Sequence, residues 1–203
     1  MNHVENLIIR YPQLKDCAPD IEQIVCEIVT AYKNGGKVLL CGNGGSAADC
    51  EHISGELLKG FLSKRKIDEN EYPALSGELR ENLQKAIPAI PLGSLSALYT
   101  AFCNDVSPEL TFAQLVFAFG KKEDVFIGIS TSGNAKNVAA AAETANALGI
   151  KTVALTGARE SKLSALCQIT VQVPETETYK IQELHLPVYH AICAEVERRV
   201  FEN

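Results

Sequence analysis

Hydrophobic residues recur at helical spacing in the first part of the chain. Residues 4–34 are expected to be helical, and the glycine pair at 35–36 ends the pattern. The apolar stripe of this region consists of Ile21, Ile24, Val25, Ile28 and Val29. Residues 1–34 are therefore expected to form an N-terminal helical region ahead of the main fold.

Short apolar runs that suit buried strands follow this region, separated by longer helical patterns. The expected strands are residues 37–41, 89–92, 125–129, 152–155 and 169–173. The expected helices are residues 47–60, 94–118, 136–148 and 178–201. Alternating strands and helices imply βαβ units and a parallel sheet with helices on both faces. The expected fold class is α/β, a three-layer sandwich of the flavodoxin-like or Rossmann-like kind.

Residues 64–86 interrupt this alternation with a polar, charge-rich stretch. The segment is expected to be a surface insertion with a short helix from about Gly77 to Lys85. A solvated excursion is favoured over a functional lid. Neither a domain linker nor an internal repeat is visible, so residues 1–203 are expected to form a single domain.

Composition limits the class of protein further. The 203 residues are 46% hydrophobic and 22% charged, which is ordinary for a globular domain. No apolar run approaches the roughly 20 residues that span a membrane, and no signal-like segment opens the chain, so a cytoplasmic protein without membrane contact is expected. The net charge of −6 argues against a nucleic-acid partner. The seven cysteines form no C-x-x-C pair and are expected to be buried thiols.

A glycine-rich turn, Gly42-Asn43-Gly44-Gly45-Ser46, follows the first expected strand and opens a helix. Backbone N–H groups and the positive end of the helix converge at such a turn and suit a phosphate. The string also matches G-x-G-x-x-A of dinucleotide-binding folds, but the acidic residue expected about 20 residues on is replaced by a basic, polar stretch. A Walker loop is excluded because no Gly-Lys-Ser/Thr follows. Alternatively, Ser46 and Asp49 form a capping box.

A second polar turn, Ser130-Thr131-Ser132-Gly133-Asn134, follows the strand at 125–129. Three hydroxyls, a glycine and the N–H groups of a helix start suit a phosphate without a cationic side chain. The alternative is a Ser/Thr-rich turn that only caps the helix. Both turns follow parallel strands, where ligands bind in open α/β sheets, so they are expected to hold one phosphorylated molecule.

Two further pairs of polar residues lie on expected helices. His52 and Glu56 are four residues apart and share a helix face. Gln182 and His190 are eight residues apart, about 12 Å along a helix. Either pair alone is compatible with surface contacts, and His185 on the same helix fits a packed core histidine.

In this order and spacing, GNGGSAADCEHISGEL, ISTSGN and IQELHLPVYH resemble the sugar isomerase (SIS) domain family and, more narrowly, the phosphoheptose isomerases. The resemblance covers nearly the whole chain. It implies a single SIS domain that converts sedoheptulose 7-phosphate to D-glycero-D-manno-heptose 7-phosphate through an enediol, the first step of nucleotide-activated heptose biosynthesis.

The resemblance also implies roles for individual residues. Glu56 and His190 match the acid/base pair, and one zinc ion per subunit is implied at His52, Glu56, Gln182 and His190. The implied substrate-binding residues are Asn43, Gly44, Ser46, Glu56, Asn104, Asp105, Ser130, Thr131, Ser132 and Gln182. Two features depart from the family pattern: Ala135 replaces a phosphate-binding serine, and the excursion at 64–86 is longer than usual.

Three alternatives remain open. Non-catalytic SIS proteins sense phosphosugars or bind the replication initiator DnaA, but they lose the glutamate that matches Glu56. Another phosphosugar isomerase is the third alternative, although the arabinose 5-phosphate type usually carries appended domains. The resemblance further implies a homotetramer with sites at subunit junctions, and residues 1–34 are the expected packing surface.

Overall fold

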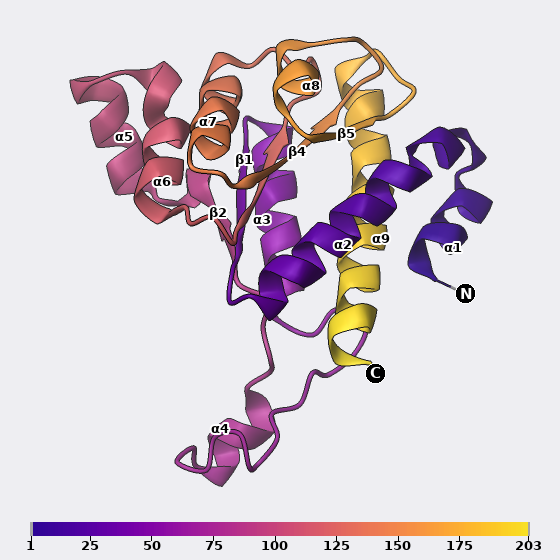
Figure 1. Cartoon of the computed structure of the whole chain (residues 1–203), viewed down its shortest axis with the longest axis vertical. Helices are drawn as coiled ribbons and strands as arrows, with labels where there is room; N and C mark the ends of the chain where they lie inside the picture. The colour runs from indigo at the N-terminus through magenta and orange to yellow at the C-terminus, as the bar shows by residue number, and fades with distance from the viewer. Residues whose placement is uncertain (1, 203) are drawn as a thin grey trace.

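A five-stranded parallel sheet forms the centre of the computed structural model, which describes residues 2–202 (Figure 1). Its strands are β1 (Val38–Gly42), β2 (Ala89–Pro91), β3 (Val125–Ile129), β4 (Lys151–Thr156) and β5 (Ile169–Gln172). They are ordered β2-β1-β3-β4-β5, and every neighbouring pair is parallel. This is the strand order of flavodoxin-like folds, in which ligands bind at the switch point between β1 and β3. The expected α/β fold class is confirmed.

Helices cover both faces of the sheet because its central strands are apolar on both sides. Alternate residues of a strand point to opposite faces, so Leu40 and Ile127 pack into one hydrophobic cluster and Leu39 and Phe126 into the other. The first cluster includes residues of α2 (Ala18–Lys33), α3 (Gly45–Leu58) and α9 (Thr178–Phe201). The second includes residues of α6 (Thr111–Phe119) and α7 (Lys136–Ala147).

Helix α9 has the expected bounds, but two expected helices are broken. The remaining helices are α1 (His3–Arg10), α4 (Gly77–Asn82), α5 (Ser96–Asp105) and α8 (Lys162–Leu166), with 3₁₀ turns at Pro12–Cys17, Leu92–Ser94 and Pro108–Leu110. The interruptions within 4–34 and 94–118 coincide with Pro12 and Pro108, since proline disfavours helical backbone in the residue before it. The five-residue α8 is too short to show a helical period in the sequence.

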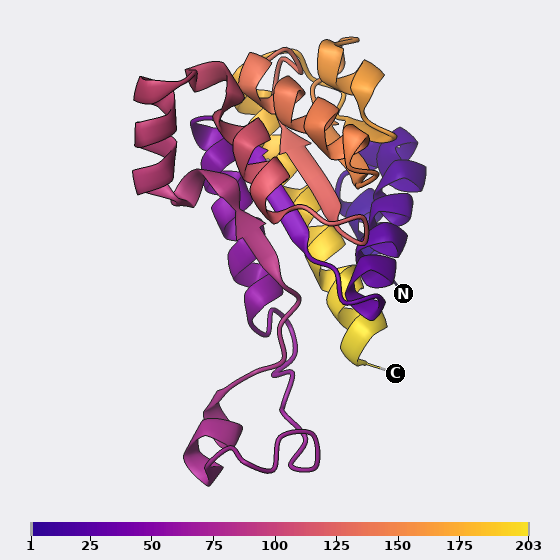
Figure 2. The same cartoon turned by 60° about the vertical axis from the view of Figure 1, so that its left-hand side comes forward.

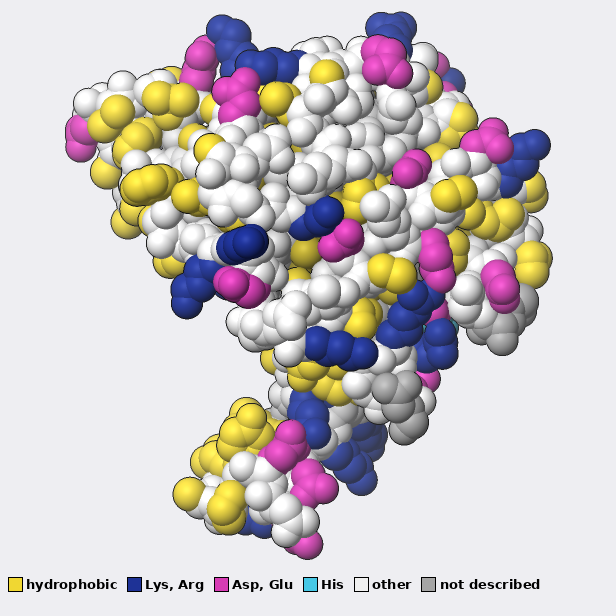
Figure 3. Space-filling view, in the orientation of Figure 1, with side chains coloured by type: hydrophobic (Ala, Val, Ile, Leu, Met, Phe, Trp, Pro, Cys, Tyr) yellow, Lys and Arg dark blue, Asp and Glu magenta, His cyan; other side chains and the backbone are white. Residues whose placement is uncertain are grey.

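The apolar stripe of α2 packs inside its own chain. Ile21, Ile24 and Ile28 are at most 1% exposed and belong to the first core cluster. The sheet and α9 therefore cover this stripe within its own chain, and the use of residues 1–34 in oligomer packing stays a prediction. Uncovered apolar side chains lie instead around α5 and α6, as Figure 3 shows at the upper left. They include Leu98, Val106, Leu110 and Phe117.

The insertion at 64–86 extends away from the sheet as an arm (Figures 1 and 2). Its helix α4 spans Gly77–Asn82 and is shorter than expected, and Ser76 caps it through a hydrogen bond to the N–H of Leu79. Exposed hydrophobic side chains gather on the arm: Tyr72, Leu79 and Leu83. Across residues 2–202, no helix has the length and hydropathy needed to cross a membrane.

Candidate active site

The two polar turns lie side by side at the sheet's carboxyl edge, since β1 and β3 are neighbours. Their contact is made by two amides: Asn43 Nδ2 donates to Asn137 Oδ1 at 2.9 Å, and Asn137 Nδ2 donates back to Asn43 Oδ1 at 2.9 Å. Asn137 was not expected as a site residue. It lies on α7, shortly after the serine turn, and no sequence signal distinguishes it from an ordinary asparagine on a helix surface.

The turn after β1 contains the expected glycine geometry but not the expected cap. Gly44 has φ 57° and ψ −122°, which a residue with a side chain rarely adopts. Helix α3 begins directly after it without a side-chain cap, so the Ser46–Asp49 capping box is wrong. Asp49 instead accepts a hydrogen bond from the Tyr189 hydroxyl at 3.2 Å. Ser46 N–H donates to the Asn43 carbonyl at 3.1 Å and Ala47 N–H to the Gly44 carbonyl at 3.0 Å, so backbone carbonyls rather than a capping side chain satisfy these N–H groups at the start of α3.

The turn after β3 also presents polar groups at a helix start. Ser130 is buried, whereas Ser132 is exposed and accepts a hydrogen bond from the N–H of Asn134 at 3.2 Å. Ala135 is the N-cap of α7 and supplies no side-chain hydrogen bond there. A cavity of about 160 Å³ opens beside this turn, and its lining includes Thr131, Ser132, Asn134, Arg159 and Thr178. Hydroxyl and helix-start N–H groups of this kind suit a phosphate.

Helices α3 and α9 lie side by side and run in the same direction. Near the start of both, Gln182 lies against Gly45, where an added Cβ would collide with its amide nitrogen. Two turns further on, His190 Nε2 lies 3.4 Å from His52 Nε2. The structure therefore brings His190 to His52 but leaves Gln182 at the other end, about 10 Å away along α3 by residue count.

His52, Glu56 and His190 form a cluster of acid/base side chains. His52 Nε2 contacts Glu56 Oε1 at 3.3 Å, and the second carboxylate oxygen of Glu56 accepts from Lys59 Nζ at 3.1 Å. The rings of His52 and His190 meet edge to face with centroids 4.9 Å apart. Burial, and after it the nearby His52, lowers the pKa of His190. His190 is therefore held toward its neutral form, which can both donate and accept a proton.

A buried ion pair fixes the backbone of Glu56. The guanidinium of Arg65 donates to the carbonyls of Glu56 at 3.0 Å and Leu57 at 2.6 Å, and it pairs with Glu197 at 2.6 Å. Glu197 also accepts from the backbone N–H groups of Phe61, Leu62 and Ser63. These contacts tie the end of α3 and the root of the arm to α9.

Asn104 and Asp105 are not brought into this cluster. They end α5 at the edge of the molecule, where Asn104 Nδ2 donates to Asp105 Oδ1 at 2.9 Å (Figure 1). His185 is fully buried and contacts the Thr156 carbonyl through Nε2 at 3.2 Å. It is a core histidine, as the sequence allowed.

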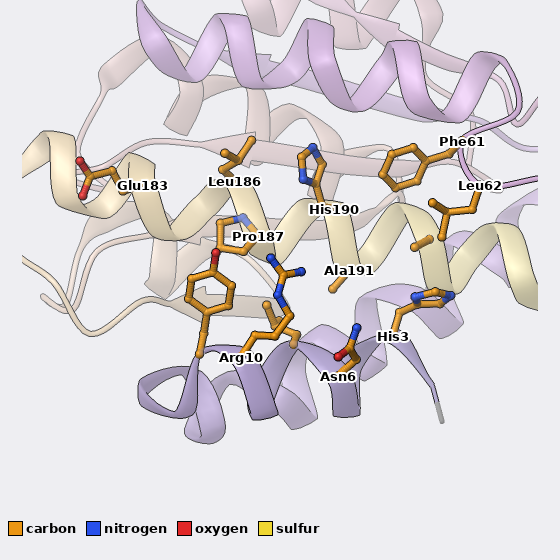
Figure 4. Close-up of a pocket in the computed structure, with 13 residues that line it drawn as sticks. His3, Asn6, Arg10, Phe61, Leu62, Glu183, Leu186, Pro187, His190 and Ala191 are labelled. Carbon is orange, nitrogen blue, oxygen red and sulfur yellow. The ribbon is translucent and has the colours of Figure 1, made fainter.

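A groove of about 430 Å³ borders His190 on the side of α1 (Figure 4). Arg10 and Asn6 of α1, Phe61, and Glu183 of α9 line it together with His190. The ring of Phe61 lies 5.6 Å from that of His190. The acid/base cluster thus adjoins an accessible groove.

The side chains of the cluster include possible metal ligands. Two imidazoles and a carboxylate are donors that suit zinc. Within residues 2–202, however, no group of three or more His, Cys, Asp and Glu side chains is arranged to hold a metal ion. The cluster therefore holds its donors in pairs, His52 with Glu56 and His52 with His190.

The fold, its strand order and the two turns after β1 and β3 are those of an α/β protein of the SIS class. SIS domain models match residues 8–86 and 97–194. The chain is 39% identical to the phosphoheptose isomerase of Aneurinibacillus thermoaerophilus, covering 90% of this chain and 83% of that one. It is also 39% identical to phosphoheptose isomerase 2 of Campylobacter jejuni, covering 97% and 90%.

A solved phosphoheptose isomerase from Francisella tularensis is similar in structure as well. It superposes with a TM-score of 0.77 at 30% identity, covering 96% of each chain. The chain belongs to the phosphoheptose isomerase family of SIS-domain proteins.

Proposed function

We propose that this protein interconverts sedoheptulose 7-phosphate and D-glycero-D-manno-heptose 7-phosphate, the step that opens nucleotide-activated heptose biosynthesis. The single observation that carries the proposal is that Glu56 and His190 both contact His52. The same fold carries two turns of the kind that binds phosphate. Relatives named phosphoheptose isomerase support the choice of substrate.

Isomerisation of this kind moves a proton between C1 and C2 through a cis-enediol. In the proposed mechanism Glu56 takes the proton from C1 and returns it to C2. His190 gives a proton to the carbonyl oxygen and takes one from the neighbouring hydroxyl. The lowered pKa of His190 suits this exchange, because a neutral imidazole has one N–H and one lone pair.

The turns after β1 and β3 are proposed to hold the phosphate. Ser46, Ser130, Thr131 and Ser132 supply hydroxyls, and helix α7 supplies N–H groups at its start. Asn43 and Gly44 shape the first turn, and Gln182 lies beside it at Gly45. Because Gln182 lies beside this turn and not beside His52, it is proposed to bind the substrate, and Asn104 and Asp105 remain proposed substrate residues on α5.

We also propose that the complete site lies at a subunit junction of a homotetramer. Ser46 and Glu56 are ten residues apart on α3, about 15 Å along its axis. Eight bonds of about 1.5 Å join C1 of a heptose 7-phosphate to its phosphorus, so the substrate spans at most about 12 Å between these atoms. A site that combines the phosphate turns of one chain with Glu56 of another would not require the substrate to span the distance from Ser46 to Glu56 within one chain. The uncovered apolar residues of α5 and α6 offer a surface for this assembly.

Zinc, implied by the family resemblance at His52, Glu56, Gln182 and His190, remains a proposal supported by the imidazole and carboxylate donors of His52, Glu56 and His190, whereas Gln182 lies about 10 Å away along α3. Where bound, zinc supplies Lewis-acid polarisation of a carbonyl. The test of the whole proposal is to incubate the protein with sugar 7-, 6- and 5-phosphates, with and without chelator, and to follow isomerisation by NMR. Turnover of the 7-phosphate supports the function. No turnover of any of them, with zinc resupplied, would contradict it.

A further inference from the structure

Arg159 lies in the loop after β4 and lines the cavity of about 160 Å³ beside the serine turn. Thr131 and Ser132 line the same cavity from the turn, and Thr178 lines it from the start of α9. The N-cap residue of α9, Glu177, makes no side-chain hydrogen bond there. Hydroxyl groups, the positive end of a helix and a guanidinium group therefore border one cavity. The proposed chemistry does not use Arg159.

The guanidinium of Arg159 is free to bind a ligand. Arg159 bonds the chain through its backbone carbonyl, which accepts from Gln172 Nε2 at 3.2 Å, whereas its guanidinium makes no hydrogen bond or ion pair within residues 2–202. Four other arginine side chains donate to carboxylates or backbone carbonyls: Arg65, Arg80, Arg198 and Arg199. A guanidinium presents its N–H donors in a planar fork, which matches two oxygens of a phosphate group.

The loop that carries Arg159 is fixed to the serine turn on both sides. Before Arg159, the N–H of Gly157 donates to the Thr131 carbonyl at 3.1 Å. After it, the N–H of Lys162 donates to Asn134 Oδ1 at 3.0 Å. A Cβ added to Gly157 would lie 3.0 Å from the Thr131 carbonyl oxygen, so loop and turn pack closely. A side chain that extends from fixed backbone loses less conformational freedom when it binds a ligand.

The carboxylates of Glu160 and Glu175 also line the cavity. Glu160 Oε2 accepts a hydrogen bond from the Ser164 hydroxyl at 3.5 Å. Both carboxylates repel a phosphate, so the neutral hydroxyls of the turn need a cation beside them to hold one. Carboxylates also accept hydrogen bonds, which the hydroxyls of a sugar donate. The lining as a whole thus suits a phosphorylated sugar rather than a simple anion.

We propose that Arg159 binds the phosphate group of the substrate beside the serine turn. This role rests on the proposed function, which supplies the phosphorylated sugar. Neither of the two phosphate turns contains a lysine or arginine, and Ala135 adds no side-chain hydrogen bond at the N-cap of α7. Arg159 supplies the positive charge that these turns lack, and it acts on binding of the substrate rather than on proton transfer.

The first test measures binding without turnover. Inorganic phosphate and sedoheptulose 7-phosphate are titrated with the protein in separate experiments, and their ³¹P NMR signals give the Kd values. Arg159→Ala is expected to raise the Kd of both ligands about tenfold, because hydrogen bonds between charged groups are about twice as strong as neutral ones. Arg159→Lys keeps a cation and is expected to retain most of the affinity. A loss in Arg159→Lys as large as in Arg159→Ala would overturn the role of the charge.

Lys162→Ala is the matched control. It removes the same charge three residues further along, but Lys162 Nζ pairs with Glu143 at 3.2 Å, so both Kd values should stay unchanged. An equal loss in Lys162→Ala would overturn the proposal, because it would show a general effect of surface charge. Unchanged binding in Arg159→Ala, or a wild type that binds neither ligand, would overturn it as well.

Kinetics separate this proposal from the proposed function. With the 7-phosphate as substrate, Arg159→Ala is expected to raise KM about tenfold and to leave kcat near the wild-type value, since it removes binding that the ground state and the transition state share. A wild type that binds the 7-phosphate through Arg159 without isomerising it would contradict only the function. An active wild type whose KM and Kd are unchanged in Arg159→Ala would overturn only the role of Arg159.

Discussion

The side chains of Asn43 and Asn137 pair through two reciprocal hydrogen bonds of 2.9 Å, which join the turn after β1 to the helix after β3. Both turns are proposed to grip one phosphate, so the pair fixes the width of the site. We expect Asn137→Ala to raise KM for the phosphorylated substrate about tenfold, equivalent to about 1.4 kcal/mol, with a smaller effect on kcat.

The control for this variant is Asn146→Ala at the far end of α7, where Asn146 bonds the Leu166 carbonyl and Thr152. Its loss is expected to lower stability and leave KM unchanged. Steady-state kinetics and thermal unfolding of both variants provide the comparison. An unchanged KM in Asn137→Ala would contradict the role given to the pair.

Glu56 and His190 carry the proposed proton transfers. Glu56→Gln keeps the shape of the side chain but removes the base, and His190→Ala removes the group that exchanges protons with the oxygens. Each is expected to lower kcat by at least about 100-fold with the fold intact. Glu51→Gln on the same helix, where Glu51 accepts from Ser94, is the matched control and should retain activity. Near-normal turnover in both test variants would exclude the assignment.

A junction site predicts complementation between two inactive variants. Ser132→Glu places a negative charge in the proposed phosphate turn, and Glu56→Gln removes the base. If the turn and Glu56 of one site come from different chains, randomly mixed oligomers regain about a quarter of their sites. Co-refolding the two variants and measuring activity decides this. Mixtures that stay inactive despite forming mixed oligomers would place the whole site within one chain.

The buried pair of Arg65 and Glu197 is expected to be costly to break. Both side chains are at most 1% exposed, and Arg65 has φ 41°, a conformation that needs support from its surroundings. Glu197→Gln leaves the guanidinium uncompensated and should lower the free energy of unfolding by about 3 kcal/mol. Glu109→Gln, which breaks the exposed pair with Lys136, should leave the free energy of unfolding nearly unchanged, because solvent screens that pair. Urea unfolding measures both, and equal losses would refute the expectation.

His185 is expected to make stability depend on pH. Burial lowers its pKa to about 4, so below the usual pKa of 6.5 the unfolded chain binds a proton that the folded chain refuses. Stability is therefore fully present above about pH 6.5 and falls as the pH drops toward 4. Between pH 7 and pH 5 the loss should be about 2 kcal/mol. His185→Gln should flatten this dependence in urea unfolding, and an equally steep loss in the variant would assign it elsewhere.

The order and type of the main elements follow from the sequence alone. Buried parallel strands must be apolar on both faces, so Val125–Ile129 is visible as a short run, and the long α9 keeps one helical pattern throughout. The glycine and serine turns were also visible, because phosphate binding restricts which residue types serve, whereas Glu56 and His190 were singled out by the family resemblance.

Tertiary structure decided which of these residues meet. Gln182 and His190 share one helix, but α9 runs in the same direction as α3, so Gln182 meets the start of α3 and His190 meets its middle. Asn137 and Arg65 became site residues only through partners distant in the chain, which no local pattern encodes. The apolar stripe of α2 has the same sequence pattern whether a neighbouring subunit or the chain's own sheet buries it, since burial by either removes the same apolar surface from water.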